Sequence, residues 1–139
     1  MRGSDFKPFE GMWLASPSGI IACAKVINGK LLIPYTRSEE RRLAGRFFDC
    51  QLVGQNLFAR FERLPKRETG VLLLTVAENF TLKGGWWTEE NLPGSAREDI
   101  TRVKPTLPGM VSAVWVLMPK AKTPAWANHY FLEWSTSEE

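Results

Sequence analysis

Short apolar stretches that alternate with polar positions recur along the chain and predict β-strands. The clearest case is 57–63, where Leu57, Ala59 and Phe61 occupy one face of an extended segment, as expected of a half-buried antiparallel strand. Within 43–53, the same alternation places Phe48, Cys50 and Leu52 on one face. Asn28-Gly29, between two apolar runs, is the strongest short signal for a hairpin turn. The predicted strands are 11–14, 20–27, 31–36, 43–53, 57–63, 71–77, 80–88, 99–104, 111–118 and 129–134.

This regular spacing of about eight to ten short strands predicts an all-β protein, because helical periodicity is almost absent. Residues 123–128 are predicted to form one helical turn, and residues 38–42 a charged connection or a single helical turn. An antiparallel sandwich fits the pattern too, but we favour a single up-and-down β-barrel of about eight strands over residues 1–139. We expect flexible ends at 1–9 and 135–139.

The segment Leu82-Lys83-Gly84-Gly85-Trp86-Trp87 places two glycines inside a predicted strand, just before adjacent tryptophans. Glycine within a strand marks a bulge, a corner or a close approach of another backbone. The alternation puts Trp86 in phase with Phe80 and Leu82, so we predict that Trp86 points inward. Trp87 is in phase with Lys83, so we predict that it points outward and offers a contact surface.

Composition narrows the possible classes of protein. Hydrophobic residues make up 44% of the chain, charged residues 24%, and the net charge is +3, which is typical of a globular domain. No apolar run is long enough to cross a bilayer, so we expect no membrane insertion. The first ten residues contain no apolar signal region, so we expect a cytoplasmic protein, with a secreted mature form as the alternative.

Charged and sulfur-containing residues indicate no catalytic or metal chemistry. The basic segments 37–46 and 60–67 are interleaved with glutamate, and we interpret them as solvated faces in preference to a nucleic-acid patch. Cys23 and Cys50 are expected to be free, buried thiols, with a disulfide as the alternative. With His129 as the single histidine, the chain offers no familiar zinc site and no Ser-His pair apart from one that would use His129 itself.

Asp49 and Glu62 are the one candidate carboxylate pair, but their alternation places both on the less apolar strand faces. We therefore predict no catalytic residue, no bound metal and no cofactor.

Several motifs resemble those of the calycin group, which comprises the lipocalin, fatty-acid-binding and avidin-type barrels. Gly11-Met12-Trp13 resembles the G-x-W that opens their first strand. Residues 43–47 resemble the L-T-G-R-Y strand of the avidin and streptavidin family, and Tyr35 lies where their pocket tyrosine is expected. Trp115-Val116-Leu117 resembles their W-L-L strand, and Trp126 is similar to the tryptophan that they lend to a neighbouring subunit. The resemblance implies a barrel that holds a small ligand and associates with copies of itself.

The aromatic residues carry our leading hypothesis, which is a non-enzymatic barrel that binds a small apolar or amphipathic ligand. Ring walls and a few hydroxyl groups would form the site, for which the candidates are Trp13, Ser16, Ser18, Tyr35, Trp86, Thr88, Trp115 and Trp126. A second hypothesis is a side-chain-filled barrel whose surface Trp and Arg side chains form a protein–protein or homo-oligomer interface. A third is a single-stranded nucleic-acid binder in which bases stack on Trp86 or Trp87, although the modest charge disfavours nucleic acid.

Overall fold

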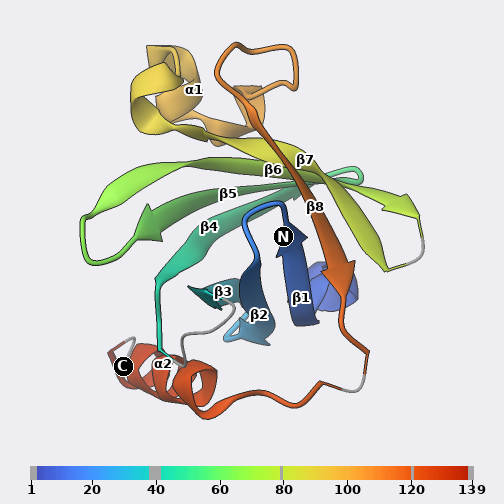
Figure 1. Ribbon diagram of the computed structural model, residues 1–139, viewed down its shortest axis with the longest axis vertical. Coiled ribbons are helices and arrows are strands. Elements are labelled where there is room, and N and C mark those ends of the chain that lie inside the picture. Colours follow the sequence, from blue (N-terminus) through green and yellow to red (C-terminus); the bar gives the residue numbers. More distant parts are fainter. Residues whose placement is uncertain (1–2, 38–41, 79, 120, 138–139) are drawn as a thin grey trace.

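The structure, a computed structural model, describes residues 3–37, 42–78, 80–119 and 121–137. Eight antiparallel strands follow one another around a closed barrel, and pairing of β1 with β8 completes it (Figure 1). This confirms the predicted all-β up-and-down barrel. The strands are β1 (Gly11–Ser16), β2 (Ile20–Ile27), β3 (Lys30–Arg37), β4 (Gly45–Val53), β5 (Asn56–Arg63), β6 (Glu68–Glu78), β7 (Thr81–Thr88) and β8 (Val111–Leu117).

Two glycine-containing segments have the backbone features that their sequences predict. Asn28 and Gly29 both have positive φ, 53° and 77°, and form the two-residue turn that joins β2 to β3. Within β7, a Cβ on Gly84 would overlap the backbone carbonyl of Leu73 in β6. On the other side of β7, a Cβ on Gly85 would lie 2.7 Å from the carbonyl oxygen of Val111. The glycine pair therefore allows both neighbouring strands to approach closely.

A β-bulge in β4 changes the predicted inward and outward faces of that strand. Asp49 has a φ of 52°, and the pairing of β4 with β5 shifts in register after Phe48. Before the bulge, Phe47 belongs to the interior core, and after it Cys50 and Leu52 pack against the same core. The prediction that Phe48 shares a face with Cys50 and Leu52 is wrong, because the bulge moves the later residues to the opposite face.

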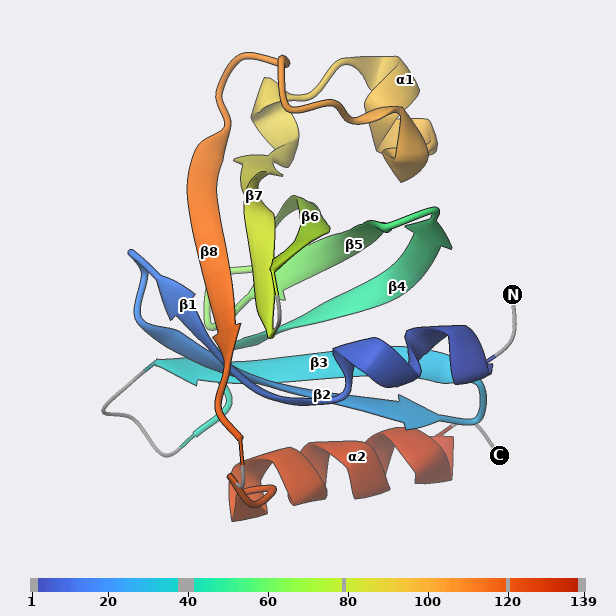
Figure 2. The same ribbon diagram turned by 90° about the vertical axis from the view of Figure 1, so that its right-hand side faces the viewer.

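The N-terminal segment forms a 3₁₀ helix, η1 (Gly3–Phe9), which lies alongside β2 and β3 (Figure 2). Its Phe6 and Phe9 are one 3₁₀ turn apart, so both face the barrel and are buried in the interior core. The indole Nε1 of Trp13 donates a hydrogen bond to the carbonyl oxygen of Phe9 at 2.9 Å. The prediction of a flexible end is therefore wrong for residues 3–9, because two buried rings anchor this segment to the barrel.

The connection from β7 to β8 covers the outer face of β5, β6 and β7 at the top of Figure 1. It contains η2 (Glu89–Asn91), α1 (Gly94–Glu98) and η3 (Ile100–Arg102). The predicted strand over 99–104 is wrong, because Asp99 caps η3 by accepting a hydrogen bond from the amide of Thr101. Ile100 and Val103 are buried where the connection packs against the barrel. Trp87 points out of the barrel as predicted, but this connection buries it completely, so the predicted contact surface there is wrong.

The chain ends in a helix, α2 (Ala125–Ser137), which packs outside the barrel near β2 and β3 (Figures 1 and 2). The predicted final strand over 129–134 is therefore wrong, and the predicted helical turn over 123–128 continues into this helix. Residues spaced by one, three, one and three positions form its packed stripe, a helical spacing. They are Trp126, Ala127, Tyr130, Phe131 and Trp134.

Both cysteines are free, as predicted. Cys23 lies on the outer face of β2 in the cluster that α2 covers, whereas Cys50 packs against the interior core, so the barrel wall separates them. The charged connection predicted over 38–42 lies outside the described residues except for Arg42.

Candidate ligand cavity

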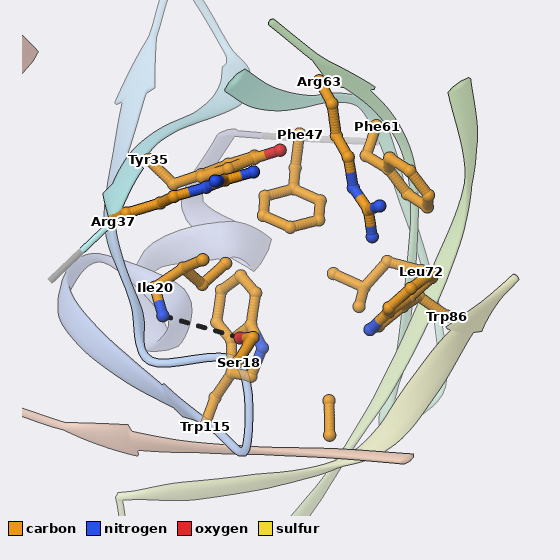
Figure 3. A pocket seen from close by; sticks show the side chains of 11 residues that line it. Ser18, Ile20, Tyr35, Arg37, Phe47, Phe61, Arg63, Leu72, Trp86 and Trp115 are labelled. Carbon is orange, nitrogen blue, oxygen red and sulfur yellow. Dashed lines mark hydrogen bonds between the residues drawn. The ribbon is translucent and has the colours of Figure 1, made fainter. Parts of the chain in front are cut away.

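The barrel interior is filled at one end and hollow at the other. Near η1, the side chains of Phe6, Phe9 and Trp13 pack with Leu31 and Leu57 and form part of the interior core. At the opposite end, where β1 joins β2 and β5 joins β6, a cavity of about 320 Å³ opens to the surface. Its size is at the lower limit of typical small-molecule pockets. Its lining is Ser18, Ile20, Tyr35, Arg37, Phe47, Phe61, Arg63, Leu72, Trp86, Ala113 and Trp115 (Figure 3).

Alternation along the strands explains why these side chains converge. Side chains two residues apart share a strand face, so Phe61 and Arg63 both point inward from β5. In the same way Tyr35 and Arg37 point inward from β3. Trp86 points inward from β7, which confirms the predicted split of the two adjacent indoles. Phe80, predicted to share its face, is instead 67% exposed in the turn before β7.

Five aromatic rings form the wall of the cavity and contact one another edge to face or at a tilt. Phe47 lies at the centre, with ring centroids 5.1 Å from Tyr35, 5.2 Å from Trp115 and 6.2 Å from Phe61. Phe61 continues the series to Trp86 at 5.8 Å and an interplanar angle of 86°. Because such contacts hold aromatic rings in specific orientations, the wall presents preformed ring surfaces to a ligand.

Two arginines lie at the open end of the cavity. The guanidinium carbon of Arg63 is 4.4 Å from the ring centroid of Trp86, a cation–π contact, and its Nη1 is 2.6 Å from a carboxylate oxygen of Glu68. Arg37 ends β3 and is exposed at the rim, and Figure 3 shows it alongside the ring of Tyr35. Positive charge therefore borders an otherwise largely apolar cavity.

The hydroxyl group of Tyr35 is the buried polar group of the wall. Burial raises the pKa of Tyr35, and this effect outweighs the opposing influence of Arg63 and Arg37. The phenol is therefore neutral near neutral pH and can donate a hydrogen bond. A second hydroxyl, that of Ser18 in the loop between β1 and β2, accepts a long hydrogen bond of 3.5 Å from the amide of Ile20.

The structure brings together half of the residues that the sequence nominated. Ser18, Tyr35, Trp86 and Trp115 line the cavity. The other four lie elsewhere: Trp13 lies in the filled end, Ser16 and Thr88 lie at strand ends outside the lining, and Trp126 lies on α2.

Sequence reasoning did not nominate Phe47, Phe61, Arg37 or Arg63. The signal that would have found the arginines is their phase, since each follows an inward aromatic residue by two positions.

The charged residues on the outer surface are paired in ways typical of a solvated barrel. Asp49 accepts a hydrogen bond from Arg60 at 3.1 Å, and Glu62 lies 3.8 Å from Arg46. His129 is exposed on α2, 3.0 Å from Glu133. Among residues 3–37, 42–78, 80–119 and 121–137, no group of three or more His, Cys, Asp or Glu side chains is arranged to hold a metal ion.

Comparison with known proteins adds no relative to this description. No protein-family model matches the chain, and neither the curated proteins nor the solved structures contain a match. Within the part of the chain that the structure describes, no helix has the length and apolar character required to cross a membrane.

Proposed function

We propose that this protein binds a small, partly apolar ligand in the ring-lined cavity and carries out no chemistry on it. The observation that supports this proposal is the combination of about 320 Å³ of accessible space with five aromatic rings and few polar groups at one open end of a closed barrel. A barrel used only as a scaffold gains stability from filling its interior, as this one does around Trp13.

The expected affinity comes mainly from apolar burial. Burial of apolar surface contributes about 25 cal/mol per Å², so a ligand that buries roughly 100 Å² gains about 2.5 kcal/mol. Stacking on a ring such as Trp86 or Trp115 adds roughly 0.5–1.5 kcal/mol per contact. The hydroxyl groups of Tyr35 and Ser18 would orient the polar end of the ligand.

A titration that follows tryptophan fluorescence and melting temperature tests the proposal. The ligand set comprises hydrophobic dyes, fatty acids and biotin, and at least one class is expected to quench Trp86 or Trp115 and to raise the melting temperature. The binding proposal fails if no ligand changes either quantity.

Two substitutions in β8 make the test specific to the cavity. Ala113→Phe adds a ring inside the cavity and is expected to abolish ligand binding, because Ala113 is part of the lining. Val114→Phe adds the same ring at the next position, on the other strand face, and is expected to leave binding unchanged. Circular dichroism establishes that both variants fold. Equal binding by both folded variants would place the ligand outside the cavity.

The resemblance to avidins supports the inclusion of biotin among the ligands. Two of the residues that carry it, Tyr35 and Trp115, line the cavity. Trp126, the tryptophan expected to reach a neighbouring subunit, is part of α2 and packs against the outside of its own barrel. We therefore propose an avidin-like ligand site contained within one chain, without the shared tryptophan.

A second candidate function is self-association through the outer face of β1 and β8. Leu14 and Val116 are cross-strand neighbours, and they remain 40% and 46% exposed. Apolar side chains that remain exposed side by side favour a protein contact. Sedimentation velocity of the wild type and of Val116→Lys tests this candidate, since a monomer at every concentration would exclude it.

A further inference from the structure

The aromatic cavity, taken alone, fits two opposite classes of ligand. Aromatic cages bind organic cations through the negative faces of their rings. Aromatic walls equally accept the flat or chain-like apolar part of an anion, provided that positive groups receive its charge. The charges at the rim therefore decide which class is favoured.

The charged side chains that line the cavity are both arginines. Arg37 and Arg63 are part of the lining, and none of the described lining residues is acidic. The carboxylate of Glu68 is paired with Arg63 and is about half exposed. Among the described residues at the rim, the two positive charges of Arg37 and Arg63 face the one negative charge of Glu68. This excess of positive charge would repel a second cation.

Two of the five rings of the cavity wall already contact a cation. Arg63 lies over Trp86 at 4.4 Å and over Phe61 at 5.3 Å from their ring centroids. An external cation that stacked on either of these two rings would have to displace this guanidinium. An anion would instead gain hydrogen bonds, because the planar fork of Arg63 carries five N–H donors. Its contacts with Glu68 and with the Tyr35 hydroxyl leave others available.

We propose that the natural ligand class is an amphipathic organic carboxylate, with its apolar part against the ring wall and its carboxylate between Arg37 and Arg63 at the rim. This proposal rests on the proposed binding function and defines its ligand. The hydroxyl of Tyr35, on the same strand face as Arg37, supplies a further hydrogen bond to the carboxylate. Figure 3 shows this hydroxyl and both guanidinium groups on the same side of the cavity.

Calorimetric titration with ligands matched in shape and different in charge tests the proposal. The aromatic pair is naphthoate and naphthamide, and the chain series is decanoate, decanol and decyltrimethylammonium. Within any set that binds, the carboxylate is expected to bind about tenfold to hundredfold more tightly than its neutral partner, because it gains charge-assisted hydrogen bonds. This preference is expected to fall as the concentration of NaCl rises.

Variants of the two arginines test whether these side chains cause the preference for the carboxylate over its neutral partner. Arg37→Gln and Arg63→Gln are each expected to weaken carboxylate binding roughly tenfold while changing binding of the neutral ligands much less. Lys83→Gln is the matched control, because it removes the same charge from the exposed outer face of β7 and is expected to leave the preference intact.

The outcomes distinguish the ligand class from the binding function itself. If the neutral or cationic ligand binds as tightly as the carboxylate, the anion proposal is wrong while the cavity remains a binding site. If both arginine variants keep the wild-type preference, the carboxylate is held elsewhere and the proposal is likewise overturned. If none of the five ligands binds and the dyes and biotin also fail, the proposed function is rejected and this inference with it. If uncharged dyes bind but no carboxylate does, biotin included, the inference alone is rejected.

Discussion

The guanidinium of Arg63 lies over the ring of Trp86, with 4.4 Å between its central carbon and the ring centroid, where the barrel cavity opens. Trp86 stands beside two glycines that allow β6 and β8 to approach β7, and Arg63 ends β5, where Glu68 pairs with it. The contact therefore joins the cavity wall to its charged rim.

Removal of the Arg63 guanidinium should expose the ring of Trp86. We expect Arg63→Met to increase quenching of tryptophan fluorescence by acrylamide and to lower the free energy of unfolding by about 1 kcal/mol or less, because the ion pair and the stack are partly solvated. The same substitution in a Trp86→Phe background is the control. The assignment would be wrong if quenching rose equally in both backgrounds.

Gly84→Ala should destabilise the barrel strongly. The added Cβ would overlap the carbonyl of Leu73, so β6 and β7 must separate, and we expect a loss of more than about 2 kcal/mol in urea denaturation. Gly94→Ala is the matched control, because a Cβ at Gly94 meets nothing within 4 Å. We expect that variant to match the wild type, and equal effects of both substitutions would refute the close-approach argument.

Trp87→Phe should loosen the connection between β7 and β8. The substitution removes the hydrogen bond from the indole Nε1 to the carbonyl oxygen of Leu107, 3.2 Å long, and leaves a void in a fully buried site. We expect a loss of about 1–3 kcal/mol and faster amide exchange over residues 89–110. The same change at Trp126, on α2, should leave exchange in that connection as in the wild type.

The two thiols should be unreactive in the folded protein. Burial raises the pKa of Cys23 to about 11 and that of Cys50 to about 12, from an ordinary value of 9.0, so little thiolate forms at pH 8. We expect slow reaction with a disulfide reagent in the native state and rapid reaction in guanidinium chloride. Rapid labelling of the native protein at pH 8 would contradict this burial.

The raised thiol pKa values also determine how stability depends on pH. The folded state holds these protons more tightly than the unfolded state, so the full stabilisation is present below about pH 9 and is lost as the pH rises through about 11 and 12. The raised pKa of Tyr35 acts in the same direction. We expect the urea midpoint to fall above pH 9, and to fall less steeply in a Cys23→Ala, Cys50→Ala double variant.

Local sequence correctly predicted those features that depend on the backbone preference of single residues. It also predicted side-chain direction correctly where the alternation of inward and outward residues along a strand is uninterrupted. Asn28-Gly29 specified its turn because both residues tolerate positive φ. Leu57, Ala59 and Phe61 were correctly placed on one face, and Trp86 and Trp87 on opposite faces, because side-chain direction in a strand has a period of two. These rules predicted the barrel and the inward direction of Trp86, which is one of the lining residues.

Only the tertiary structure decided what covers each strand face and where the alternation breaks. The bulge at Asp49 reverses the faces of Cys50 and Leu52, and a period of two cannot foresee it. Trp87 points outward yet is buried, because a connection tens of residues long folds back over it. Arg37 and Arg63 line a cavity instead of a solvated face, since their strands end at the open mouth of the barrel. The direction in which a side chain points from its strand is a local property. Its burial depends on which distant segment packs against that face of the strand.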